Sequence, residues 1–240
     1  MKHGYLIRAV SSVNGLLRSA FRFGVGLVNE WRGVGGRLDS PLDYDSLAIM
    51  NSPFRAVTTP EKARLRVEDF LLLNDNGAFD KYSKTELIQG EIYFINAQHS
   101  RHARIKTQLA VELSVRLREL GSEFQPIVEA STRISDDSLP EPDIVVTSYK
   151  GPGVVPLESV ALLVEVSDST LEIDLGRKAD LYAKASVPEY WVVDVNENRV
   201  LMHIQPRSDG SGYDGQLDVP FGEPLYSTTI ADLTVETGVL

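Results

Sequence analysis

The pattern of apolar and polar residues predicts three helices. Residues 101–120 carry apolar side chains at spacings of four and three before Gly121, which is the strongest helical pattern in the chain. The expected core positions of this helix are Ile105, Leu109, Leu113, Leu117 and Leu120. A second helix is predicted over residues 61–73, where a capping Thr59 precedes a proline, and a third over residues 171–186. Each helix should bury one apolar face.

Strands are predicted between and after these helices. Residues 85–97 form two short runs around Gln89-Gly90, which is typical of a strand or hairpin. Residues 142–148 and 160–167 are almost continuously apolar and β-branched, which indicates central strands covered on both faces. Further strands are predicted over residues 123–135, 189–196 and 199–206, and loop and turn over residues 209–224. This order of elements indicates an α/β or mixed α+β fold.

The N-terminal part of the chain differs from the rest in charge and pattern. Residues 1–40 hold six basic and two acidic side chains, a net of +4, which leaves −14 for the remainder of a chain whose total is −10. Residues 41–60 contain three prolines and no sustained period. We therefore predict a poorly ordered extension and linker over residues 1–58 and a folded domain over residues 59–240. An amphipathic surface helix and a transit-like segment are the alternatives for the leader.

Composition excludes several classes of protein. The sequence has no cysteine, so disulfides, thiolate metal sites and a cysteine nucleophile are absent, and a cytoplasmic location is expected. No stretch approaches the roughly 20 apolar residues of a membrane-spanning helix, so we expect no membrane association. Glycine-rich phosphate loops and a GxSxG elbow are also absent. Four histidines without an HExxH pattern give no support for a zinc centre.

Two carboxylates stand where the pattern demands apolar residues. Asp143 follows Pro142 at the head of one apolar run, and Glu165 interrupts another. A buried carboxylate is costly unless it is paired or binds a metal ion, and Mg²⁺ takes one or two carboxylates from a protein. The two acids are therefore a candidate metal pair. Otherwise, Glu165 would face solvent from a half-exposed strand, and Asp143 would form a turn after proline.

Basic residues near these acids allow two interpretations. Lys178 shares a helix face with Asp174 and Tyr182, where it would lie beside a metal or form an ordinary surface ion pair. His102 belongs to a helix with several basic residues, and its face would be either solvated or in contact with phosphate. The basic residues of that helix that could attract phosphate are Arg101, Arg104, Lys106, Arg116 and Arg118.

Several motifs resemble those of the Uma-two family, which is classed with restriction endonucleases in the PD-(D/E)xK nuclease superfamily. They are TELIQGEIY, HARI, LPEPDIVV and LLVEVSDSTLEIDLGRKADLYAKASVPEYWVVD, within residues 60–205. The resemblance implies a restriction-endonuclease-like mixed β-sheet flanked by helices. It also implies that Asp143 and Glu165 bind metal and that Glu86 is the first acidic position. Ser167 stands where the superfamily has its lysine, and Lys178 is the relocated lysine of this family.

The function implied by the resemblance is hydrolysis of DNA phosphodiester bonds by an endonuclease that uses Mg²⁺ or Mn²⁺. The implied catalytic residues are Glu86, Asp143, Glu165 and Lys178. A homodimer would suit an enzyme that cuts two strands, although no interface motif is visible. The alternative is a catalytically inactive nucleic-acid-binding or protein-interaction module on the same fold. On a neutral interpretation, Glu86 would be a solvated strand residue.

Overall fold

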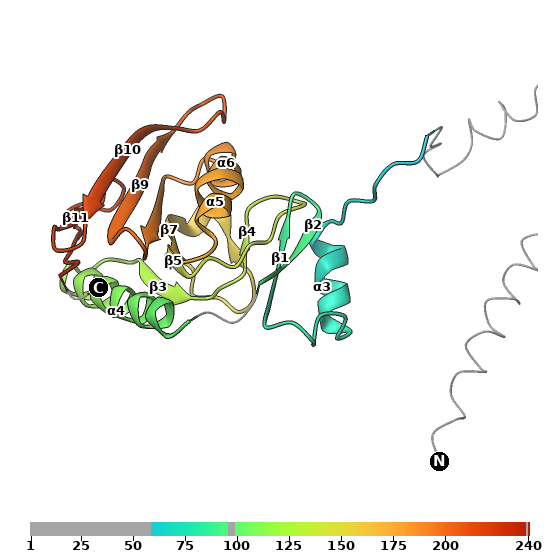
Figure 1. Ribbon diagram of the computed structural model, residues 1–240, viewed down its shortest axis with the longest axis horizontal. Coiled ribbons are helices and arrows are strands. Elements are labelled where there is room, and N and C mark those ends of the chain that lie inside the picture. The colour runs from blue at the N-terminus through green and yellow to red at the C-terminus, as the bar shows by residue number, and fades with distance from the viewer. Residues whose placement is uncertain (1–58, 96–98, 239) are drawn as a thin grey trace, which may run out of the picture. The chain divides into compact units, whose positions relative to one another are not determined.

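A six-stranded mixed β-sheet forms the centre of the molecule (Figure 1). The computed structural model describes residues 59–95, 99–238 and 240, so the extension predicted over residues 1–58 lies outside the described part. In spatial order the strands are β10 (Tyr213–Pro220), β9 (Arg199–Pro206), β8 (Glu189–Asp194), β7 (Val160–Ser167), β5 (Ile144–Thr147) and β3 (Gln125–Val128). β7 and β8 run parallel, and all other neighbours are antiparallel. The predicted mixed α+β class is confirmed.

Helices cover both faces of this sheet, as expected for strands that are apolar on both sides. All eight residues of β7 are buried. One face, which includes Leu162 and Val164, packs against α4 (Ser100–Glu119) through the stripe that begins at Ile105. The other face, which includes Leu163, packs against Tyr182 of the helical segment that follows β7. Packing against these two layers fixes the positions of the side chains at the ends of β5 and β7.

The helical segment after β7 has three parts rather than the single regular helix that the sequence pattern predicts. They are α5 (Leu171–Ile173), the π-helical η2 (Asp174–Lys178) and α6 (Ala179–Lys184). A π-helical turn holds one extra residue and rotates the side chains around it. Asp174 and Lys178 are both buried in this turn, so the hypothesis of an ordinary surface ion pair is wrong.

A hairpin and a helix form a smaller layer with its own apolar core. β1 (Lys84–Ile88) and β2 (Glu91–Ile95) pair around a turn in which Gln89 and Gly90 both have positive φ angles, 53° and 77°, as tight hairpin turns require. The core of this layer is formed by Val67, Phe70, Phe79, Leu87 and Leu139. Reciprocal backbone hydrogen bonds between Leu87 and Leu139 join the hairpin to the loop that leads into β5.

The helix α3 (Val67–Asp75) begins six residues later than the pattern of residues 61–73 predicts. Its first turn is capped by a hydrogen bond from the Arg66 amide to the Asp69 carboxylate. Before that, the amide of Leu65 donates to Gly90 O at 3.0 Å, so the backbone runs along the hairpin turn. Tertiary hydrogen bonding therefore overrides the capping signal at Thr59.

The prediction of loop and turn over residues 209–224 is wrong for the half of this stretch that forms β10. Only part of this strand is covered, so its sequence carries no regular apolar pattern. Its ladder with β9 spans the length of both strands. Gly215 fits this ladder because a Cβ there would lie 2.6 Å from Cγ1 of Ile204. Pairing with β9, rather than local propensity, defines this strand.

The remaining elements are short. They are the parallel pair β4 (Thr132–Arg133) and β6 (Val155–Pro156), the 3₁₀ turn η1 (Leu157–Ser159), and the antiparallel pair β11 (Leu225–Tyr226) and β12 (Thr234–Val235). Leu120, predicted as core, is 42% exposed because it follows the last turn of α4. Within the described residues, no helix combines the length and apolar character needed to cross a membrane.

Candidate active site

The side chains of Asp143 and Glu165 project from the same face of the central sheet. β5 and β7 are antiparallel, with Ile144 opposite Val164. One step further along this ladder, Asp143 falls opposite Glu165, and directly opposed residues of an antiparallel pair point to the same side. The Val166 amide donates to Asp143 Oδ2 at 2.8 Å. Both acids are buried, which excludes the outward-facing alternative for Glu165.

Lys178 joins three carboxylates from three parts of the chain. Its Nζ lies 2.8 Å from Glu165 Oε1 and 3.0 Å from Glu86 Oε2. Asp174, one helical turn earlier, has Oδ1 at 3.9 Å. The π-helical turn therefore brings the relocated lysine to the carboxylate of β7. The structure thus groups Glu86, Glu165 and Lys178, three of the four residues that the sequence singles out.

Glu86 enters the site from the hairpin. Its side chain is fully buried, so the interpretation of Glu86 as a solvated strand residue is wrong. Oε1 accepts a hydrogen bond of 3.0 Å from the Glu141 amide and lies 3.5 Å from Lys84 Nζ. Oε2 faces Lys178 but accepts no hydrogen bond of ordinary geometry. One carboxylate oxygen in the buried cluster is thus incompletely satisfied.

Asp143 has two basic residues as neighbours that the sequence analysis did not assign to the site. His102 Nε2 lies 3.1 Å from Oδ2, and Lys106 Nζ lies 3.4 Å from Oδ1. Both side chains are buried on α4, so the solvated interpretation of His102 is wrong, and its contact with phosphate stays a prediction. The sequence could have indicated that both residues are buried, because both extend the apolar stripe that contains Ile105 and Leu109. A polar residue on an otherwise apolar stripe indicates a buried partner.

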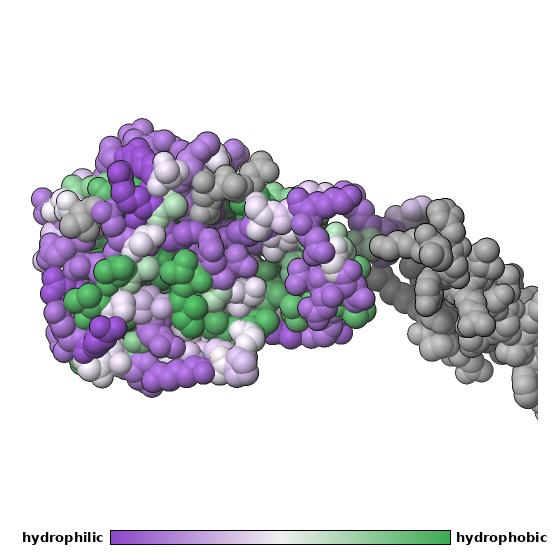
Figure 2. Space-filling view, turned by 90° about the horizontal axis from the view of Figure 1, so that it is seen from below, coloured by the Kyte–Doolittle hydropathy of each residue, from purple (hydrophilic) through white to green (hydrophobic). Residues whose placement is uncertain are grey.

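Three of the five basic residues singled out on α4 have partners within the protein. Lys106 also pairs with Glu129, Arg116 pairs with Glu112 and Glu119, and Arg101 donates to Asn198. Exposed valines interrupt the outer face of this helix. Figure 2, which views the molecule from below Figure 1, shows apolar patches among polar residues rather than a uniformly polar surface. The basic residues singled out on this helix are thus largely occupied.

Electrostatics divides the buried acids into two kinds. Burial acts to raise the pKa of Asp143, but the hydrogen bond from His102 and the charge of Lys84 outweigh it and hold that pKa well below its usual range. Burial raises the pKa of Glu165 and Asp174, although Lys178 opposes this shift. Burial also acts against the Lys178 ammonium, but the charges of Glu165, Glu86 and Asp174 together outweigh it and raise the lysine pKa. The ionised form is therefore favoured at Asp143 and disfavoured at Glu165 and Asp174.

This donor set suits a hard divalent cation that keeps most of its own water. Asp143 and Glu165 offer carboxylate oxygens, Glu86 Oε2 is incompletely satisfied, and added positive charge would favour the ionised form of the buried Glu165. Among the described residues, however, no group of three or more aspartate, glutamate, histidine or cysteine side chains is arranged to hold a metal ion. A cation here would therefore take one or two carboxylates, and lysine and histidine contacts would have to yield to it.

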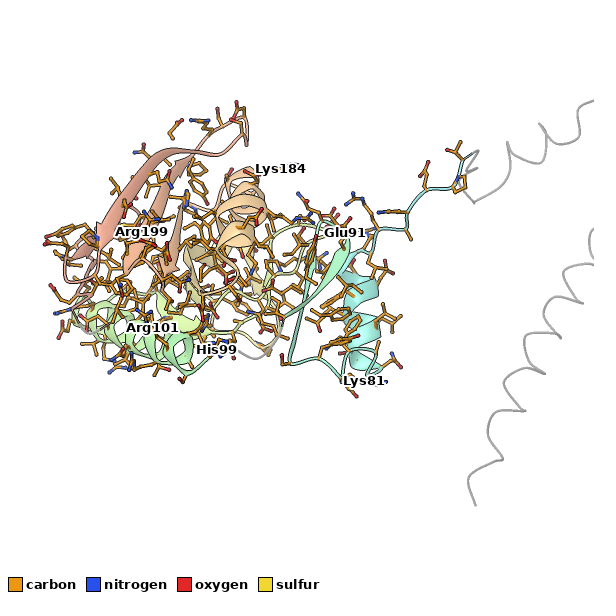
Figure 3. The ribbon with its side chains drawn as sticks, in the orientation of Figure 1. Lys81, Glu91, His99, Arg101, Lys184 and Arg199 are labelled. Atoms are coloured by element: carbon orange, nitrogen blue, oxygen red, sulfur yellow. The ribbon has the colours of Figure 1, made fainter. Side chains whose placement is uncertain are left out.

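A cavity of about 490 Å³ leads to this cluster. Its polar wall includes Glu86, His102, Asp174 and Lys178. Its remaining lining residues are Ile88, Tyr93, Phe94, Ile95, His99, Asp168, Ser169, Thr170 and Ile173. Figure 3 labels His99, which precedes α4, and Glu91, which lies on β2 of the hairpin. Residues of both elements line the cavity. The volume falls within the range of about 300–1,000 Å³ found for ligand pockets.

Comparison with known proteins places the chain among nucleases. A family model, Uma2, described as "Putative restriction endonuclease", matches residues 67–236. The chain is also similar to a solved structure from Anabaena variabilis ATCC 29413, described as "a putative nuclease belonging to DUF820". The two are 14% identical with a TM-score of 0.54, over 73% of this chain and 96% of that chain, so the likeness shows the fold. No curated protein matches the chain.

Proposed function

Because the chain belongs to the Uma2 family of restriction-endonuclease-like proteins, we propose that it is an endonuclease that hydrolyses DNA phosphodiester bonds with Mg²⁺ or Mn²⁺. The family supports a nuclease, and the nature of the nucleic acid and the metal is our proposal. One observation carries it. Lys178 Nζ lies 2.8 Å from Glu165 on the sheet face that Glu165 shares with Asp143.

Asp143 and Glu165 would hold the cation. A bound divalent cation of this type polarises a phosphoryl oxygen and lowers the pKa of a coordinated water. The low pKa of Asp143 supports this assignment, because the carboxylate stays ionised at neutral pH. His102 and Lys106 fix the orientation of this carboxylate from α4.

Lys178 would act through its charge. A lysine ammonium has no lone pair, so it cannot ligate a metal ion. Its positive charge, held in a buried site, can stabilise the negative charge that develops on phosphate in the transition state. Tyr182 donates to Glu165 Oε1 at 3.2 Å and thereby orients the carboxylate that also contacts Lys178.

A plasmid-nicking assay with Mg²⁺ or Mn²⁺, run beside calorimetric titration of Mg²⁺, tests the proposal. Asp143→Asn and Glu165→Gln should each lower the cleavage rate by roughly 10³-fold or more and weaken metal binding. Lys178→Met should lower the rate by a similar factor with a smaller loss of metal affinity. Asp180→Asn, an exposed carboxylate on α6, is the matched control and should cut like the parent chain.

The alternative is a nucleic-acid-binding or protein-interaction module without catalysis. It is favoured by the contacts of Lys178, Lys106 and His102, which already engage carboxylate oxygens that a metal would need. A parent chain that binds no divalent ion and cuts no plasmid would establish this alternative. If cleavage occurs, sedimentation of the active species would test whether a homodimer supplies the two sites needed for two strands.

A further inference from the structure

We propose that the cavity beside Lys178 binds an unpaired nucleobase, so that the chain prefers single-stranded over duplex DNA. The inference rests on the proposed function only in taking nucleic acid as the ligand. It concerns the apolar half of the cavity, which no step of the proposed hydrolysis uses. This half is formed mainly by the hairpin β1–β2 and by Ile173 of α5.

The depth of the polar cluster limits what can reach it. Lys178 is 4% exposed, and Glu86 is fully buried. A phosphate on the surface of an intact duplex would stay at the mouth of the cavity. A paired base enters a pocket only after it is unstacked and unpaired, which costs free energy in a duplex and least in a single strand. A flexible strand can carry one nucleotide inward past the hairpin.

The hairpin side of the cavity provides an aromatic surface for a base. Phe94 lines the cavity and is 48% exposed. Its ring stacks on Tyr82, with 3.7 Å between the ring centroids and 19° between the planes. Tyr82 is also 48% exposed, so the two rings form one continuous apolar surface, and such surfaces can mark binding sites. Bases stack on such rings without regard to sequence.

The aromatic pair is anchored in the core of the hairpin layer. Phe94 meets Phe79 with 6.2 Å between centroids, and Phe79 stacks on the buried Phe70 at 5.2 Å. Phe94 and Tyr82 are therefore the outer, exposed members of a chain of packed rings that begins in the interior. A fixed ring loses little conformational freedom when a base stacks on it.

The charge of the molecule also favours stacking as the main source of affinity. A chain with a net charge of −10 gains no long-range attraction for a polyanion. Near the cavity, cationic groups are few and local. Lys178 lies at the floor, and Arg177 lies over the ring of Tyr93 at 5.0 Å from its centroid. Binding must draw on the base as well as on phosphate.

Fluorescence anisotropy in Ca²⁺ buffer tests the inference without requiring cleavage. Three labelled probes of equal length are compared: a single strand, the corresponding duplex, and an abasic strand that keeps the sugar and phosphate but lacks bases. The parent chain should bind the single strand at least about 5-fold more tightly than either other probe. Phe94→Leu should weaken single-strand binding by about 5- to 100-fold and leave abasic-strand binding unchanged.

Two further variants keep the test decisive. Phe94→Trp retains an aromatic face and should bind like the parent, which guards against a folding defect in Phe94→Leu. Tyr226→Leu removes another exposed aromatic ring, on β11, and should have no effect. Equal binding of single strand and duplex, or equal affinity of Phe94→Leu and the parent, overturns the inference.

The outcome is separable from that of the proposed function. A chain that binds single strands through Phe94 but cuts nothing retains this inference and loses the nuclease proposal. A chain that cuts duplex DNA with no dependence on Phe94 retains the nuclease proposal and loses this inference.

Discussion

Two regions of the molecule bury carboxylates in opposite ways. Glu189 on β8 is fully buried and accepts hydrogen bonds from Trp191 Nε1 at 2.8 Å and from the Ser227 hydroxyl at 2.7 Å. The amides of Thr228 and Thr229 each add a bond of 3.1 Å. In the Lys178 cluster, by contrast, three buried carboxylates share one lysine, and Glu86 Oε2 has no hydrogen bond of ordinary geometry.

The difference separates a structural acid from a candidate catalytic one. Neutral donors surround Glu189 from several directions, so its charge is satisfied without a mobile or exchangeable partner. The acids of the Lys178 cluster instead rely on ammonium groups. Lys178 is shared by all three acids, and Lys84 contacts Glu86. Burial beside like charges is a recognised sign of a functional site, because such pKa shifts rarely serve stability.

The largest effect is expected from Lys178→Met. Removing the shared cation leaves three buried acids with Lys84 and neutral donors alone, and should lower the free energy of unfolding by about 3–5 kcal/mol at pH 7. The loss should shrink at pH 5, because protonation can then neutralise the acids. Urea denaturation at both pH values measures the change.

Lys184→Met is the control for this variant, because Lys184 is exposed on α6 of the same helical segment (Figure 3). It should change stability by no more than about 0.5 kcal/mol. Equal stability of the two variants would contradict the view that Lys178 holds the cluster together.

A smaller loss, of about 1–3 kcal/mol, is expected from Glu189→Gln. The amide group would turn a donor toward either Trp191 Nε1 or the donors of the Ser227 loop, and one buried donor would lose its acceptor. Metal-dependent cleavage should be unchanged once the variant is assayed below its melting temperature. Loss of cleavage in a folded Glu189→Gln protein would break the distinction between the two regions.

The smallest effect, a gain of roughly 1–2 kcal/mol in the metal-free protein at pH 7, is expected from Glu165→Gln. Because burial raises the pKa of Glu165 above 4.5, the folded chain binds a proton that the unfolded chain has released, and parent stability falls as pH rises above that value. Melting temperatures from pH 4 to pH 8 should show the gap between variant and parent widening with pH.

Asp143 should show a pH dependence of the opposite sign when the same melting experiment is extended below pH 4. Its pKa is lowered from 3.8 in the folded chain, so its contribution to stability is present above that value and lost as pH falls below it. Parent and Glu165→Gln should therefore lose stability alike under strong acid. A gap that narrows as pH rises would show that Glu165 is ionised and well paired with Lys178.

The central fold could be predicted because its strands are apolar on both faces. The runs at 142–148 and 160–167 contain β5 and β7, since no local alternative would bury so many β-branched residues. β10 could not be predicted, because its partly exposed residues acquire strand structure from pairing with β9. The first residue of α3 could not be predicted either, because the preceding residues are held along the hairpin turn by a hydrogen bond from Leu65 to the distant Gly90.

The candidate site could be predicted at positions where a charged residue interrupts an apolar run. A carboxylate inside an apolar run, as at Glu165, must find a partner, and that reasoning needs no structure. The contact of Glu165 with Lys178 depends on a π-helical turn, which the sequence pattern does not reveal. His102 and Lys106 were missed because their basic neighbours suggested a solvated face, although both lie on the stripe that α4 buries.

The contact between Glu86 and Lys178 joins residues 92 positions apart in the chain. Contacts between distant residues slow folding, because a large loop must close before they contribute. β7, the helical segment and β8 are neighbours in sequence, so we expect them to assemble early and to place Lys178 beside Glu165. Docking of the hairpin would then complete the cluster late, and a refolding chain would recover most of its secondary structure before it regains a finished site.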